Sequence, residues 1–136
     1  MQIYRPSDKR YSIRGLHPSP SSQLQAELFA ALSALGYRVL VESHLQLFDF
    51  YGSHRGLCRF DLLVAVDQKP LAIIEVKASQ HPLWHQTRQG KRYRSFGLPV
   101  VLFWDIAYLR DLVEFLAEQD RLRLTAASLS ATQAIQ

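Results

Sequence analysis

The sequence predicts an α/β fold with a mixed central sheet and helices on both faces of that sheet. Apolar residues recur at helical spacing over residues 24–35 and again over 106–118. Two nearly continuous apolar runs, 57–66 and 71–77, are typical of strands that are covered on both faces. Glycine, proline and short polar stretches separate these segments. The expected order of elements along the chain is therefore αβββαβα.

Length and composition limit the classes of protein to consider. The chain has 136 residues, of which 48% are hydrophobic and 21% charged, as expected for one globular domain over 1–136. Its net charge of +4 favours an anionic partner such as nucleic acid. The alternative is that this mild positive charge only keeps the protein soluble. A single cysteine excludes an internal disulfide. Without a signal-peptide or membrane-spanning pattern, we expect a cytoplasmic or nucleoid-associated protein with no membrane partner.

The ends of the chain differ from its middle. Residues 1–20 contain three prolines and four basic side chains, which predicts a basic arm, either solvated or lying along a phosphate backbone. Residues 125–136 are small and polar, and we expect a flexible tail. Between them, the first helix should begin at Ser21 or Ser22 and end at Gly36. The other expected elements are strands at 37–47, 57–66, 71–77 and 99–104, and helices at 82–96 and 106–118.

Three charged residues interrupt the apolar strands, namely Asp61 in the first run and Glu75 and Lys77 in the second. Moving such a charge from water into the apolar interior costs on the order of several kcal/mol, unless the charge pairs with another or binds a metal. Glu75 and Lys77 are two residues apart and share one face of a strand. Asp61 joins them only if the hairpin pairs it opposite one of the two. That register requires an odd loop, such as Asp67-Gln68-Lys69.

In that register, the carboxylates of Asp61 and Glu75 would face one point, and the carbonyl of Val76 could add a third oxygen. Oxygen ligands of this kind suit Mg²⁺ or Mn²⁺. Such an ion would polarise a phosphate and activate a water molecule, which Lys77 could orient. The alternative is a structural network of salt bridges without any metal.

The pattern Phe60-Asp61 followed by Glu75-Val76-Lys77 resembles the PD-(D/E)xK nuclease superfamily, except that Phe60 stands where that family usually has proline. The resemblance covers about residues 21–104. It implies a restriction-endonuclease-like αβββαβ core and Mg²⁺- or Mn²⁺-dependent hydrolysis of DNA, with Asp61, Glu75 and Lys77 as catalytic residues. It also implies that an acid of the first helix, here Glu27, reaches the metal. A plain surface glutamate is the alternative for Glu27.

A second resemblance lies in the following helix. Gln89 and Tyr93 are similar to the Gln-x-x-x-Tyr element of RecB-type and CRISPR-associated nucleases, which implies that Gln89 belongs to the active site and that Tyr93 contacts DNA. Gln86 is a competing candidate for the role of Gln89. Trp84 and Tyr93 could stack on bases, and basic side chains could track phosphates. The basic residues expected to bind DNA are Arg59, Arg88, Lys91, Arg92 and Arg94, with a merely solvated basic helix face as the alternative.

Together these features predict a metal-dependent DNA endonuclease of the restriction, homing or Holliday-junction-resolving type. We expect a homodimer or higher homo-oligomer, because cutting two strands requires two sites. One alternative is a catalytically inactive DNA-binding or assembly module with the same fold, which would bind DNA without Mg²⁺ and never nick it. Another is a protein-interaction subunit in which the charged residues stabilise the fold.

Overall fold

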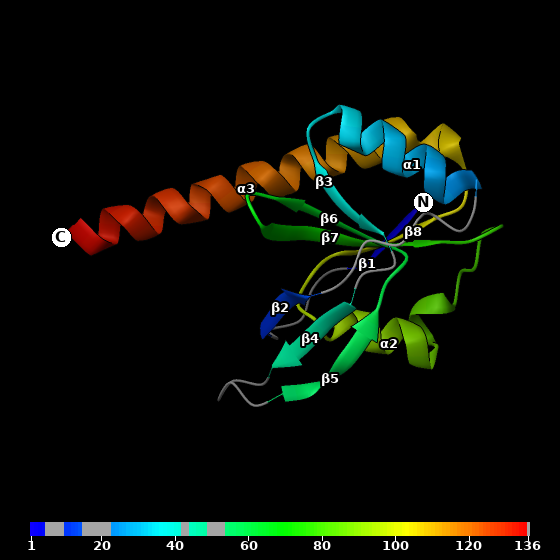
Figure 1. The fold of residues 1–136 in the computed structure, drawn as a ribbon, viewed down its shortest axis with the longest axis horizontal. Coiled ribbons are helices and arrows are strands. Elements are labelled where there is room, and N and C mark those ends of the chain that lie inside the picture. The colour runs from blue at the N-terminus through cyan, green and yellow to red at the C-terminus, as the bar shows by residue number, and fades with distance from the viewer. Residues whose placement is uncertain (5–9, 15–22, 42–43, 49–53, 136) are drawn as a thin grey trace.

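A five-stranded sheet with the strand order β1-β8-β7-β6-β3 lies at the centre of the domain (Figure 1). The computed structural model describes residues 1–4, 10–14, 23–41, 44–48 and 54–135, and all structural statements concern these residues. The β7–β8 pair is parallel and the other pairs are antiparallel. The predicted α/β class with a mixed sheet is therefore confirmed. The strands are β1 (Gln2–Tyr4), β3 (Arg38–Val41), β6 (Leu62–Val66), β7 (Lys69–Val76) and β8 (Val100–Phe103).

A second, three-stranded antiparallel sheet lies beside the first, with the order β2-β4-β5. Its strands are β2 (Arg10–Arg14), β4 (His44–Phe48) and β5 (His54–Arg59). The single strands predicted over 37–47 and 57–66 are wrong in this respect, because each is divided between the two sheets. Two parts of the predicted arm, β1 and β2, also belong to the sheets.

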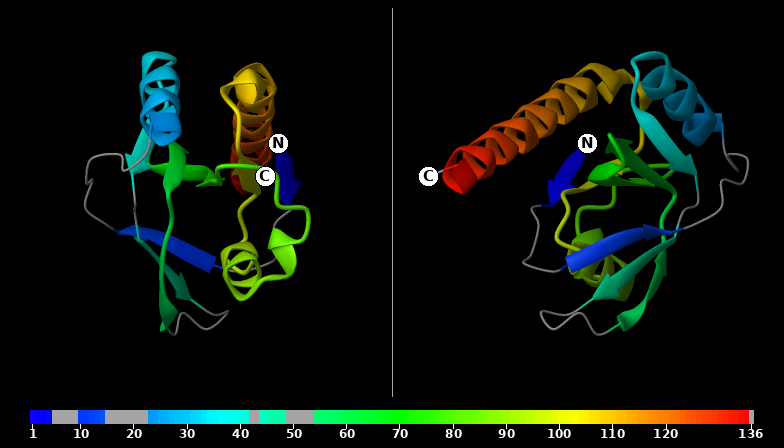
Figure 2. Two further views of the ribbon diagram at one scale, coloured as in Figure 1. Left: turned by 90° about the vertical axis from the view of Figure 1, so that its right-hand side faces the viewer. Right: turned by 60° about the vertical axis from the view of Figure 1, so that its left-hand side comes forward.

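Helices cover both faces of the five-stranded sheet, as Figures 1 and 2 show. On one face, α1 (Gln23–Ala34) and α3 (Leu109–Ile135) pack against a cluster that includes Leu62, Ile74 and Phe103. On the other face lie the short 3-10 helix η1 (Trp84–Gln86) and α2 (Arg88–Arg94), over a cluster that includes Phe60 and Ile73. A further turn, η2 (Ile106–Tyr108), precedes α3.

The helices differ from the sequence prediction in two ways. The helix expected over 82–96 is shorter and broken at Thr87, which has an extended backbone and whose side chain caps α2 by accepting the N–H of Gly90. The last helix continues to Ile135 instead of ending at Glu118, so residues 125–135 are helical. Gly36 follows α1 with φ of 95°, as the predicted glycine stop requires, whereas the expected caps at 21–22 lie outside the described residues. In the described part of the chain, no helix is both long and apolar enough to cross a membrane.

The hairpin between β6 and β7 decides which residues meet at its open end. Its turn has two residues, Asp67 and Gln68, both with positive φ, so the predicted three-residue loop is wrong. A two-residue turn alone would place Asp61 on the wrong face of the sheet. A β-bulge corrects the register, because Ala65 pairs with Pro70 but Val64 pairs with Ala72. Beyond the bulge Leu62 pairs with Ile74, which puts Asp61 level with Glu75 as the prediction required.

The turn geometry leads to a stability prediction. Gln68 has φ of 64°, a conformation that glycine adopts without the steric cost that a side chain incurs. Gln68→Gly should therefore raise the free energy of unfolding by about 0.5–1 kcal/mol, measured by urea denaturation. Gln68→Val should lower it, because a β-branched residue is strained at positive φ. Equal midpoints for the two variants would contradict this turn.

Candidate active site

Asp61 lies at the bend where the chain leaves β5 and enters β6. Its side chain is half-buried, and its Oδ2 accepts the backbone N–H of Val76 at 2.9 Å. Its own carbonyl oxygen accepts a hydrogen bond from Nε2 of Gln25, on α1, at 3.1 Å. Asp61 is thus attached both to the end of β7 and to the first helix, and its carboxylate is held beside that of Glu75.

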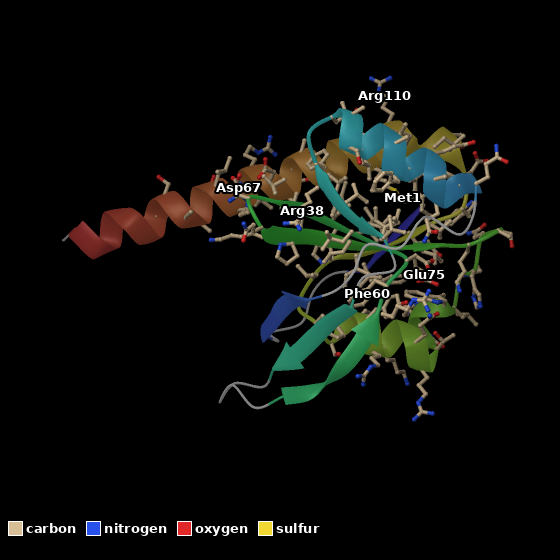
Figure 3. The ribbon with its side chains drawn as sticks, viewed as in Figure 1. Met1, Arg38, Phe60, Asp67, Glu75 and Arg110 are labelled. Carbon is tan, nitrogen blue, oxygen red and sulfur yellow. The ribbon has the colours of Figure 1, made fainter. Side chains whose placement is uncertain are left out.

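Glu75 is almost fully buried, with 4% of its surface exposed, on the side of the sheet that faces α2 (Figure 3). Its Oε1 forms an ion pair with Nζ of Lys77 at 3.1 Å. Its Oε2 is buried and has no hydrogen-bond partner among the described residues. A buried carboxylate oxygen without a partner is costly, and such an atom is unusual outside sites that bind a ligand, an ion or water.

The surroundings of Glu75 raise its pKa to about 7. Burial is the largest cause, and the negative charge of Asp61 adds to it. Lys77, and more weakly the Tyr93 hydroxyl, lower the pKa without cancelling the effect of burial. The Tyr93 hydroxyl also donates to the carbonyl oxygen of Arg59 at 2.9 Å, and Oε2 of Glu75 has no hydrogen-bond partner among the described residues. Lys77 alone therefore does not offset the effects of burial and of the Asp61 charge on Glu75.

The backbone of Val76 adds a further oxygen on the same side. Its N–H points to Asp61, whereas the N–H of the next residue, Lys77, points away from Asp61 to the Phe103 carbonyl at 2.9 Å. In a strand the N–H and C=O of one residue point to the same side, so the Val76 carbonyl also points toward the Asp61 side.

This set of oxygens fits a hard divalent cation. Two carboxylates, one of them with an unpartnered buried oxygen, meet beside a backbone carbonyl, which is the chemistry that Mg²⁺ and Mn²⁺ select. No cluster of three or more acidic, histidine or cysteine side chains occurs in the described residues. A bound ion would therefore complete its coordination with the carbonyl, water and substrate.

The first helix contributes a different residue from the one predicted. Glu27 is exposed on α1 and accepts a hydrogen bond from Nε2 of Gln23 at 3.2 Å. Gln25 occupies the buried face of the helix with Leu28 and contacts Asp61. The structure does not bring Glu27 to the carboxylates. Sequence reasoning misses Gln25 because it searches this helix for an acid.

Gln89 and Tyr93 form a hydrogen-bonded chain rather than a surface for bases. The indole N–H of Trp84 donates to Oε1 of Gln89 at 3.1 Å, and Nε2 of Gln89 donates to the Tyr93 hydroxyl at 3.2 Å. Tyr93 is only 3% exposed and Trp84 only 2%, so the predicted stacking of either ring on a base does not fit. This series of hydrogen bonds ends at the Arg59 carbonyl and so connects α2 to the strand before Asp61. Gln86 is exposed and lies outside this chain of hydrogen bonds.

The predicted basic residues are placed unequally. Arg88, Lys91 and Arg92 are exposed on α2, over the same face of the sheet as Glu75. Arg94 is half-buried, with its guanidinium 6.0 Å from the centre of the Tyr4 ring. Arg59 is exposed at the end of β5, two residues before Asp61.

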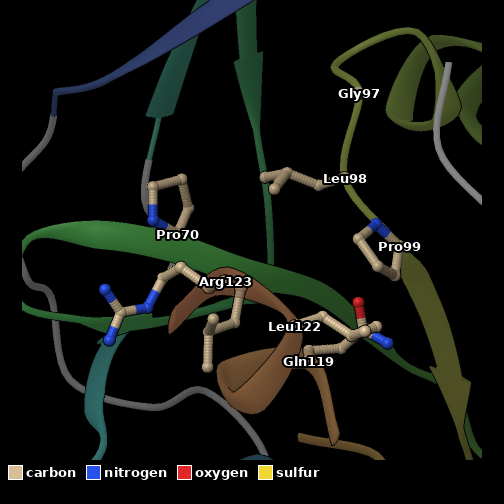
Figure 4. Close-up of a pocket in the computed structure, with 8 residues that line it drawn as sticks. Pro70, Gly97, Leu98, Pro99, Gln119, Leu122 and Arg123 are labelled. Carbon is tan, nitrogen blue, oxygen red and sulfur yellow. The ribbon is translucent and has the colours of Figure 1, made fainter. Parts of the chain in front are cut away.

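A hollow of about 320 Å³ lies elsewhere, between α3 and the segment before β8 (Figure 4). Pro70 and Leu71, at the start of β7, form part of its lining, whereas Glu75 is near the end of that strand. Its charged lining residue, Arg123, pairs with Asp120 at 2.9 Å. This hollow is therefore separate from the two carboxylates.

The raised pKa of Glu75 predicts how stability varies with pH. Because the folded-state pKa, about 7, lies above the ordinary 4.5, protonated Glu75 stabilises the metal-free fold fully below pH 4.5. That contribution is lost as the pH rises through 7. In EDTA, the free energy of unfolding should fall between pH 5 and 8 by of the order of 2 kcal/mol more for the wild type than for Glu75→Gln. Parallel denaturation profiles for the two proteins would show that Glu75 titrates normally.

Comparison with models of protein families, with curated proteins and with solved structures gives no match to this chain. A functional assignment must therefore rest on the arrangement of the residues themselves. That arrangement is a pair of carboxylates with a lysine at the end of β7, beside an exposed basic helix.

Proposed function

We propose that this chain is a metal-dependent DNA endonuclease that hydrolyses phosphodiester bonds, with a restriction-endonuclease-like core. The observation that carries the proposal is the buried, unpartnered Oε2 of Glu75 beside the carboxylate of Asp61 and the ammonium of Lys77. The order Asp, then Glu-x-Lys on the next strand of a hairpin, is the order that the PD-(D/E)xK resemblance leads us to expect. The β-bulge that brings Asp61 level with Glu75 supports the same assignment.

Each residue of the site has a distinct role in this proposal. Asp61, Glu75 and the Val76 carbonyl hold Mg²⁺, or Mn²⁺ in its place. When bound, the ion supplies a polarised phosphate and a water of lowered pKa. Lys77 is 32% exposed, so its ammonium can reach a phosphate in solution while it remains paired with Glu75. There it orients the attacking water and offsets the negative charge that builds on the phosphate.

The exposed basic side chains of α2 supply the binding surface for DNA. Arg88, Lys91 and Arg92 lie over the same sheet face as Glu75, so a phosphate backbone following this helix passes close to the site. Interactions of this kind position a nucleic acid without selecting its sequence. Breaking both strands of a duplex would require two such sites, and hence a homodimer, whereas nicking would require one.

A catalytically inactive DNA-binding or assembly module is the second candidate. It is favoured by the lack of a third acidic ligand among the described residues and by the direct ion pair between Glu75 and Lys77. Such a module would bind DNA equally in Mg²⁺ and in EDTA, and would leave plasmid DNA intact.

Cleavage of supercoiled plasmid and of a four-way junction separates the two candidates. The wild type should nick DNA in Mg²⁺ or Mn²⁺ but not in EDTA. Asp61→Asn, Glu75→Gln and Lys77→Met should each lower the rate at least about a hundredfold, because each removes a group that acts on the reacting phosphate or its metal. Glu114→Gln, the same change at an exposed residue of α3, is the matched control and should cut at the wild-type rate. Cleavage by Glu75→Gln at that rate would refute the proposal.

The contribution of α2 to DNA binding is tested by salt dependence. Arg88→Gln, Lys91→Gln and Arg92→Gln, made in the Glu75→Gln background to prevent cutting, should each weaken binding of a fluorescent duplex of any sequence. The slope of log Kd against log salt should fall by about one for each phosphate that the variant no longer neutralises. Arg110→Gln removes an arginine that is also exposed, from α3 on the opposite face of the sheet, and is the matched control. Equal slopes for all these proteins would place the DNA elsewhere.

A further inference from the structure

Gln25 is an unusual residue for its position in the fold. Its exposed fraction is 1%, and Gln25 and Glu75 are the two buried polar or charged residues of the described chain. It shares the inward face of α1 with Leu28 and Leu32, which are fully buried. Burying a side-chain amide is unfavourable unless its hydrogen bonds are satisfied, and a leucine would pack there without that requirement. The amide must therefore do something that packing alone does not explain.

The Gln25 amide contacts the main chain of Asp61, far away in the sequence. Nε2 of Gln25 donates to the Asp61 carbonyl at 3.1 Å, across 36 positions of sequence. Asp61 lies in the bend between two strands of different sheets, one residue before the paired part of β6. The regular hydrogen bonds of the sheet therefore do not fix it. Asp61 is instead attached by two hydrogen bonds outside the sheet ladder. Gln25 of α1 donates to its carbonyl, and the Val76 amide donates to its carboxylate.

We propose that Gln25 is a positioning residue that holds the bend at Asp61, so that the Asp61 carboxylate stays at the end of β7 facing Glu75. The repulsion between the two carboxylates would otherwise favour rotation of Asp61 away from Glu75. A neutral amide suits this task, because a glutamate at position 25 would add a third negative charge and, when ionised, could not donate to a carbonyl. The effect of Gln25 on metal binding rests on the proposed function, but its positioning of Asp61 does not.

Hydrogen exchange at the Val76 amide, in EDTA, tests the positioning directly. Val76 donates to Asp61, whereas the neighbouring Lys77 amide donates to Phe103 on the other side of the strand. In Gln25→Met, protection of the Val76 amide should fall at least about tenfold, while protection of the Lys77 amide stays unchanged. Gln23→Met, the same substitution at an exposed position of α1, should change neither amide.

Affinity for Mn²⁺ alone, measured by calorimetry on the EDTA-stripped protein, tests the consequence. Gln25→Met should weaken binding about tenfold to a hundredfold, the usual effect of removing a residue that orients a metal ligand. In an Asp61→Asn background the same substitution should have no further effect, because the residue through which Gln25 acts is already without its charge. A purely structural role for Gln25 would instead lower affinity by the same factor in both backgrounds.

The outcomes separate this inference from the proposed function. Unchanged Val76 protection in Gln25→Met, or an equal decrease of affinity in both backgrounds, would overturn the role of Gln25. If Gln25→Met does not fold, Gln25→Asn retains an amide that is one methylene too short to reach Asp61, and the same results are expected of it. A wild type that neither binds Mn²⁺ nor cuts DNA would refute the nuclease, whereas the Val76 measurement would still decide the role of Gln25.

Discussion

Two carboxylates share one small volume at the end of β7, and the ammonium of Lys77 forms an ion pair with one of them. Glu75 is buried, the charge of Asp61 raises its pKa further, and one of its oxygens lacks a hydrogen bond among the described residues. With both acids ionised, the three residues carry a net charge of −1 in a poorly solvated place. A bound cation would relieve this repulsion and would give Oε2 a partner. The electrostatic strain is thus the main physical argument for a metal site.

That arrangement depends on a register that the turn alone does not provide. The two-residue turn at Asp67 and Gln68 sets one pairing, and the bulge near Val64 shifts it by one residue before the strands reach Asp61. The position of a bulge is hard to predict from sequence, because it depends on packing across the whole sheet. The sequence does contain one signal, since Pro70 lies inside the strand and proline is tolerated within sheets mainly at edges and bulges. The predicted loop Asp67-Gln68-Lys69 is therefore wrong, but the bulge produces the register that this loop was expected to produce.

The sequence predicts the α/β class, the mixed sheet and the meeting of Asp61 with Glu75 and Lys77, because charges inside apolar strands are rare and adjacent strands pair. It fails where helical phase matters more than residue chemistry. Gln25 is three residues before the buried Leu28, which places it on the core face, and Glu27 is not in that phase. Tyr93 likewise lies three residues from both Gly90 and Phe96, which are buried. Choosing residues by their expected chemistry puts Glu27 in the site and Tyr93 on the surface.

The two faces of the sheet make different contributions to the site. From the face covered by α1, Gln25 reaches the backbone of Asp61. From the face covered by α2, a series of hydrogen bonds from Trp84 through Gln89 and Tyr93 reaches the backbone of Arg59, two residues before Asp61. Both sets of hydrogen bonds therefore converge on the short segment that joins the two sheets, and that segment carries the carboxylate. A bend with little sheet pairing of its own needs such support from both sides, since a displacement of about 1 Å there would separate groups that act together in the proposed site.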